Sequence, residues 1–302
     1  MKKYILLIFL TILFLLVYNF RETITSFAIS LMRENSIPTL EYKNEFYKDD
    51  EYNYVELIND FNIKDKKQLL NAYYTIINSG INEFSFYCNN KYEECINDVI
   101  TLADNQKLLS VLNGFVHPFN SFSSIETIYD NYGKVTVKIN KSYTEEQIIQ
   151  INQKVDEIIE KEIKPTMDNK EKIKAIHDYI INNATYDKDK SDKNITKYNS
   201  STAYGALLEG YAICGGYTDA MEIFLDRFDI PSFEVISENH IWNAVYLNNK
   251  WYHLDLTWDD PISVEGFNIL DYNFFLISTK ELKELNTSQH NFDKTIFTEL
   301  AN

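Results

Sequence analysis

The sequence contains few cysteines, three among 302 residues. So small a number excludes a domain held together by many disulfides, and it excludes a zinc site built from four cysteines. Because the number is odd, at least one thiol has no partner within the chain. Any thiol chemistry therefore has only three candidate residues.

Basic residues are scarce relative to acidic ones. The chain has 29 Lys and Arg against 45 Asp and Glu, which gives a formal net charge of −16. Nucleic-acid binding depends on clustered Lys and Arg that meet phosphates, so we expect no nucleic-acid partner. With 45% hydrophobic and 25% charged residues the chain is globular, and its length suits one large domain or two modest ones.

An apolar segment, YILLIFLTILFLLVYNF, covers residues 4–20 directly after a basic N-terminus. As a helix it spans roughly 25 Å, a little less than the ~30 Å hydrocarbon core of a membrane. The best cleavage candidate, Ser26-Phe27-Ala28, follows the charged Arg21-Glu22, which disfavours processing. We therefore predict an uncleaved transmembrane anchor over residues 1–20, with a cleaved signal peptide as the alternative.

The predicted location follows from the two lysines at the start, Lys2 and Lys3. Positive charges stay on the cytoplasmic side of a membrane, so the rest of the chain is expected outside. The prediction is a single-pass protein of the cell membrane with its C-terminal domain outside. Secretion after signal cleavage is the alternative.

Composition and periodicity divide the rest of the chain into three parts. Residues 21–50 are polar and are predicted to form a stalk, residues 51–142 a mainly helical region of unknown role, and residues 143–302 the domain with the chemistry. In the middle part, Cys88 and Cys95 lie seven residues apart around a polar loop. In an oxidising compartment they could form a local disulfide, and two free thiols are the alternative.

Several local patterns predict individual elements. Apolar residues spaced by three and four predict a helix within residues 57–80, ending at Gly80, and alternation predicts a strand over residues 132–141. Capping-box patterns at Thr144 and Asp168 predict the starts of two further helices.

The segment GYAICGGYTDA places Cys214 at the start of a predicted helix. The unpaired N–H groups and the dipole of a helix start favour an anion, and therefore the reactive thiolate. Gly215 and Gly216 are poor helix residues, which indicates that something approaches the backbone closely. Tight helix–strand packing would explain the same glycines.

A predicted hairpin supplies two partners for this thiol. The strands HIWNAVYL and KWYHLDLTW are joined by Asn248-Asn249, and Asn suits a two-residue turn because it tolerates positive φ. With that turn, His240 and Asp255 are diagonal neighbours on one face, within reach of a side-chain hydrogen bond. A cysteine, a histidine and an aspartate so placed are what nucleophilic thiol catalysis needs.

Three segments resemble the bacterial branch of the transglutaminase-like superfamily, namely IHDYIINNATYD, GYAICGGYTDA and ENHIWNAVYLNNKWYHLDLTWDDP. The resemblance covers residues 165–262 and implies that Cys214 is the nucleophile, His240 the base and Asp255 the third member of a triad. The sequence departs from the family's pattern at two positions. Ile241 stands where the family usually has Ala, and Gly215 stands where polar residues are common. The implied fold is α+β, with a papain-like core whose Cys helix packs on an antiparallel sheet carrying His and Asp.

The implied function is thiol-dependent acyl transfer or hydrolysis at peptide or side-chain amides of the cell envelope, with water or an amine as acceptor. Protein or peptide at the cell surface would be the substrate. A non-catalytic peptide-binding or cell-wall-binding module on the same fold is the alternative. No cofactor is expected, and no metal, because His and Cys are not placed at ligand spacing along the sequence.

Four residues near the triad are weaker candidates for a substrate pocket. They are Trp242, Tyr211, Gly215 and Tyr217, and for Trp242 the simpler interpretation is an aromatic residue of the core or of a cleft wall.

Overall fold

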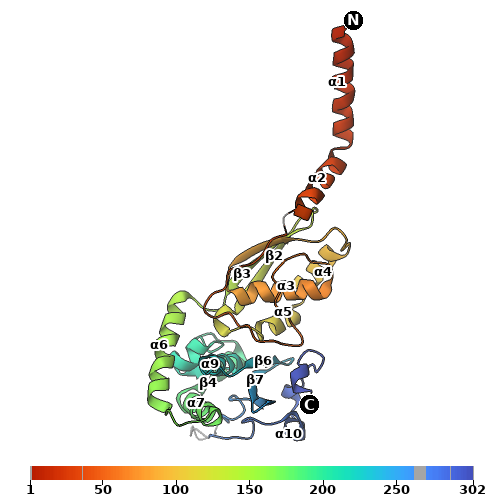
Figure 1. Cartoon of the computed structure of the whole chain (residues 1–302). Coiled ribbons are helices and arrows are strands. Elements are labelled where there is room, and N and C mark those ends of the chain that lie inside the picture. Colours follow the sequence, from red (N-terminus) through yellow and green to blue (C-terminus); the bar gives the residue numbers. More distant parts are fainter. Residues whose placement is uncertain (1, 36, 262–269, 286, 302) are drawn as a thin grey trace.

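The computed structural model describes residues 2–35, 37–261, 270–285 and 287–301, which form a mixed α/β molecule (Figure 1). In the N-terminal half the elements are α1 Lys2–Asn19, α2 Arg21–Asn35, α3 Lys66–Ser79, β1 Glu83–Tyr87, α4 Cys95–Asp104, α5 Gln106–Asn113, η1 Pro118–Asn120, β2 Phe122–Tyr129 and β3 Lys134–Lys141. They are followed by α6 Glu145–Glu162, α7 Asn169–Asn183, β4 Thr185–Tyr186, α8 Lys188–Lys193, η2 Gly205–Glu209, β5 Tyr211–Ala212, α9 Cys214–Arg227, β6 Ser232–Ile236, β7 Ile241–Leu247, β8 Lys250–Leu254, α10 Thr279–Glu284, η3 Ser288–His290 and η4 Thr298–Leu300.

Helices α1 and α2 extend away from the rest of the molecule (Figure 1). Among the described residues, no single helix is long and apolar enough to cross a membrane. The two helices pass that test only together, and they are bent by 65° at their junction. The predicted anchor over residues 1–20 remains a prediction.

The region 51–142, predicted to be mainly helical, is instead mixed. Helix α3 lies inside the expected range, with Asp65 capping its start and Gly80 ending it at φ 79°. The strand expected over residues 132–141 is confirmed as β3, and it is the centre of an antiparallel sheet of order β1-β3-β2. We had not predicted β1 and β2.

A disulfide joins Cys88 to Cys95, between the end of β1 and the start of α4. The two Cα atoms lie 5.9 Å apart. The link closes the polar loop between them and leaves Cys214 as the one free cysteine.

The hairpin expected from Asn248-Asn249 is confirmed. Both residues have positive φ, 52° and 62°, and Leu247 pairs with Lys250 across the turn. Strands β6, β7 and β8 form one antiparallel sheet in that order, and α9 packs against β6 and β7. The capping boxes predicted at Thr144 and Asp168 are also present, at the starts of α6 and α7.

This sheet separates two hydrophobic cores, because its side chains alternate between its faces. On β7, Trp242 and Ala244 join the core of the N-terminal region, together with Phe233 of β6. Val245 of the same strand joins the core built from α6, α7 and α9. The N-terminal region therefore packs on one face of the sheet that carries the candidate site, and residues of the C-terminal segment, Phe274, Phe297 and Leu300 among them, share that core.

A buried ion pair reinforces this contact. Lys48 is 5% exposed, and its Nζ lies 2.8 Å from Oε1 of Glu222 on α9 and 2.6 Å from the carbonyl oxygen of Ser232. Burial alone would lower the pKa of Lys48, but Glu222 raises it above its usual range, so the lysine stays charged. The predicted stalk of residues 21–50 is therefore wrong for its last residues, which pack into the body.

We predict that Lys48→Met lowers the free energy of unfolding by about 3–5 kcal/mol, because it leaves the Glu222 carboxylate buried without its cation. Urea unfolding of the full chain measures the change. Lys193→Met is the control, since it removes an exposed ion pair with Asp189 and is expected to change nothing measurable. A loss no greater than that of the control would contradict the prediction.

Candidate active site

Cys214 is the first residue of α9, and the residue before it, Ile213, is extended. The thiol is half-buried and unpaired. A Cβ on Gly215 would lie 2.8 Å from the carbonyl oxygen of Ser201, and one on Gly216 would lie 2.4 Å from that of Ser200. The glycines therefore let the preceding loop approach the helix start, which is the packing explanation of their presence.

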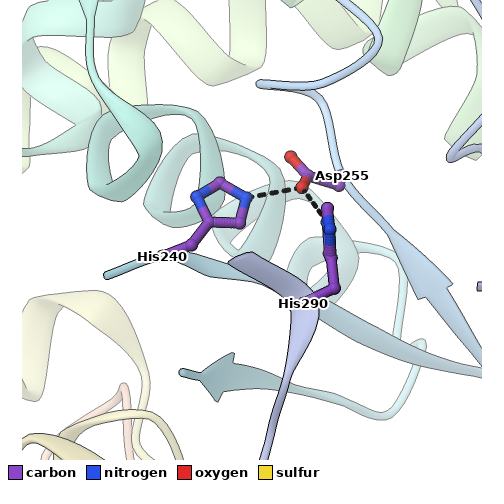
Figure 2. Close-up of side chains that lie close together, drawn as sticks. All are labelled: His240, Asp255 and His290. Carbon is purple, nitrogen blue, oxygen red and sulfur yellow. Dashed lines mark hydrogen bonds and ion pairs between the residues drawn. The ribbon is translucent and has the colours of Figure 1, made fainter. Parts of the chain in front are cut away.

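His240 and Asp255 meet as the hairpin geometry predicts. Nε2 of His240 lies 2.6 Å from Oδ2 of Asp255 (Figure 2), and the two residues are 7% and 2% exposed. His240 stands just before β7 and Asp255 just after β8, so the two paired strands fix the distance between their side chains. The sequence identified both residues and their contact.

The Cys214 thiol acts on the same imidazole. Burial by itself would lower the pKa of His240, but Asp255 and then Cys214, each through charge and a hydrogen bond, raise it to about 10. Since Nε2 faces Asp255, Nδ1 is the ring nitrogen left for Cys214. Both Asp255 and Cys214 thus raise the pKa of His240, which favours an imidazolium.

The Asp255 carboxylate stays ionised in this buried position. Burial raises its pKa, but His240 and His290 outweigh that effect and hold the pKa at about 2. Its other oxygen, Oδ1, accepts a hydrogen bond of 3.2 Å from the backbone N–H of Trp258. The nearby Asp259 is not a competing third member, because it pairs with Nε2 of His177 at 3.1 Å.

His290 is a residue of the site that sequence reasoning missed. Its Nε2 lies 2.8 Å from Oδ2 of Asp255, the same oxygen that faces His240 (Figure 2). It reaches the site because the C-terminal segment folds back over the sheet, with bridges between His253 and Ile277 and between Ser237 and Phe292. No local motif marks such a long-range return.

The ligand-type atoms of His240, Asp255 and His290 lie within 4.8 Å of one another, close enough to surround one ion. The sequence alone shows no such cluster, because folding brings His290 to the other two. Both rings face one carboxylate oxygen at hydrogen-bond distance, so hydrogen bonds already satisfy the three groups.

Trp242 forms the wall behind His240. The two rings stack with centroids 5.6 Å apart, and the Trp242 side chain is fully buried. Its Nε1–H donates to Nδ1 of His253, whose Nε2 bonds Oγ1 of Thr279 at 3.0 Å. Burial and then the charge of His290 lower the pKa of His253 to about 3, so this ring stays neutral and can accept the bond.

The structure places the other pocket candidates differently from one another. Tyr217 is buried like Trp242, and its hydroxyl donates to the Asp260 carboxylate, so neither ring offers a surface to a substrate. Tyr211 is half-exposed and stacks on Tyr198 with centroids 3.9 Å apart. Its place in a substrate pocket, and that of Gly215, stay predictions.

We predict that Asp255→Asn lowers the pKa of His240 from about 10 toward or below its ordinary value of 6.5, because burial then acts with less opposition. Titration of the ring by NMR measures the change. Asp259→Asn is the matched control, since Asp259 bonds a different histidine. An unchanged pKa of His240 in Asp255→Asn would contradict the prediction.

Two solved structures are similar at 15% identity, one described as a TGase and one from Cytophaga hutchinsonii assigned as a cysteine protease, with TM-scores of 0.34 and 0.29. The similarity covers 56% and 49% of this chain, and 62% and 65% of those chains, less than two thirds of either. Comparison with curated proteins gives no match.

A family model also matches the chain. The matched residues are 153–256, and the family is described as the Transglutaminase-like superfamily. This range contains Cys214, His240 and Asp255. The chain therefore carries a transglutaminase-like domain over residues 153–256.

Proposed function

We propose that the protein is a thiol-dependent enzyme that transfers or hydrolyses acyl groups at peptide or side-chain amides. The observation that carries the proposal is the position of His240, which is hydrogen-bonded to a buried, ionised Asp255 and has its pKa raised further by the Cys214 thiol. A packed structural histidine would not need both partners.

The reaction takes place in two halves. The Cys214 thiolate attacks the amide carbonyl carbon, the C–N bond breaks, and the His240 imidazolium gives its proton to the leaving amine. The resulting thioester is then attacked by water or an amine, whose proton passes to His240 as the thiolate leaves. The backbone N–H of Cys214, at the start of α9, is a natural donor to the oxyanion in both halves.

We also propose that the enzyme works outside the cytoplasm, held by its N-terminal segment, on amides of surface proteins or wall peptides. Two observations support this location. The side chains of α1 from residue 4 onward are exposed, and all except Thr11 and Asn19 are apolar. The Cys88–Cys95 disulfide is of a kind that persists in oxidising compartments.

Reactivity of the single free thiol tests the proposal. With the disulfide intact, a thiol-reactive probe is expected to label the wild type at Cys214 and to leave Cys214→Ala unlabelled. His240→Ala is expected to slow labelling at pH 6 by roughly 10²-fold, because an unassisted thiol is less than about 1% thiolate there. Amide turnover that survives Cys214→Ala would contradict the proposal. A Cys214 unreactive near neutral pH would favour the peptide-binding module.

The acceptor is tested with a tagged primary amine and a protein mixture. Incorporation of the tag that requires Cys214 identifies an acyltransferase, and new protein termini without incorporation identify a hydrolase. Cys214→Ala is the matched control for both. If the thiol labels normally but neither product forms, both reactions are excluded for the proteins supplied.

A further inference from the structure

Both nitrogens of His290 are committed to partners. Its Nε2 faces Oδ2 of Asp255 at 2.8 Å, and its Nδ1 lies 2.5 Å from Oγ1 of Thr287. An ionised carboxylate can only accept hydrogen bonds, so Nε2 of His290 carries a proton. The hydrogen-bond network thus assigns His290 as a donor to Asp255.

The ring is also held tightly by its neighbours. His290 is 5% exposed and stacks on Phe274, with centroids 4.9 Å apart and planes 14° from parallel. Trp242 and Trp258 close two further sides at 4.9 and 5.2 Å. A ring so enclosed cannot move away from Asp255 without displacing these aromatic side chains.

We propose that His290 is a positioning residue of the triad, which donates to the carboxylate oxygen that also faces His240 and so limits how strongly Asp255 holds the imidazolium. The inference rests on the proposed function for its catalytic meaning, but the interaction exists in the resting protein. It can therefore be tested without a substrate.

The reason lies in the sharing of one oxygen. Two N–H donors on the same carboxylate oxygen each reduce the charge available to the other. When His240 gives up its proton to a leaving group, Asp255 loses its cationic partner while buried at 2% exposure. The His290 donor remains, so the carboxylate is not left unpaired, and release of the proton costs less.

Other charged groups near His240 do not take this part. The thiol of Cys214, at the start of α9, affects the pKa of His240 and is not among the groups that shift the pKa of Asp255. His253 on β8 is neutral and forms hydrogen bonds with Trp242 and Thr279. Asp259, which follows β8, forms a hydrogen bond with His177. Among the described side chains facing the triad, His290 is the donor that shares Asp255 with His240.

The test compares two substitutions that separate the ring from the donor. His290→Phe keeps an aromatic ring in the enclosure and removes the N–H, whereas His290→Gln keeps an N–H donor and removes the ring. The full chain in detergent, labelled with ¹⁵N histidine, has only five histidines to assign. NMR titration gives the pKa of His240 in each protein, and the pH dependence of Cys214 alkylation gives a second readout.

We expect His290→Phe to raise the pKa of His240 by roughly half a unit to one unit, because Asp255 then holds the imidazolium alone. The upper inflection in the pH dependence of the Cys214 alkylation rate is expected to move to higher pH together with the pKa of His240. In His290→Gln, both this inflection and the pKa of His240 are expected to stay near the wild-type values. No rise in His290→Phe, or equal shifts in both variants, would reduce His290 to a packing residue and overturn the inference.

A measurement on the wild type guards against variants that fail to fold. The ¹⁵N shifts are expected to show His290 with its proton on Nε2, and a neutral ring protonated on Nδ1 alone would overturn the inference. The two proposals fail separately. If Cys214 is inert but the pKa of His240 responds to His290→Phe as expected, the proposed function fails and the role of His290 stands. If Cys214 is reactive but the pKa of His240 does not respond, the role of His290 fails and the proposed function stands.

Discussion

The structure of the site depends on one buried carboxylate. Asp255 is 2% exposed, and an anion in that position persists only if donors surround it. Here they come from three parts of the chain, namely His240 before β7, His290 in η3 and the backbone of Trp258. Because each donor belongs to a different segment, the carboxylate ties the hairpin to the C-terminal return, and the orientation of the imidazole follows from that tie.

Local signals predicted the part of the site that lies within one hairpin and one helix start. Positive φ at Asn248 and Asn249 sets the register, and the register alone brings His240 to Asp255. Cys214 was predicted as a site residue because the start of a helix favours an anion, and the glycines after it marked that helix start. The burial of Tyr217 could not be read in this way, because the residues that cover it come from distant segments.

The misjudged parts of the fold have the same origin. Strands β1 and β2 flank β3, and each pairs with it. Their alternating patterns are too short to predict a strand without that pairing. Lys48 reads as a polar residue of a stalk until Glu222, far along the chain, supplies its counter-charge. The N-terminal region packs on one face of the sheet and shares its hydrophobic core. The transglutaminase-like range 153–256 is therefore not an independent folding unit.

The C-terminal return has a consequence for the order in which the site is completed. Cys214, His240 and Asp255 precede residue 270 in the chain, whereas Phe274 and His290 follow it. This last segment is joined to the sheet by isolated bridges, not by a continuous ladder, and buried side chains such as Phe297 and Leu300 hold it in place. During synthesis the three reacting residues therefore leave the ribosome before the segment that backs them. In the finished protein, a protease that trims this segment would uncover Asp255 to water while leaving the three reacting side chains on the chain.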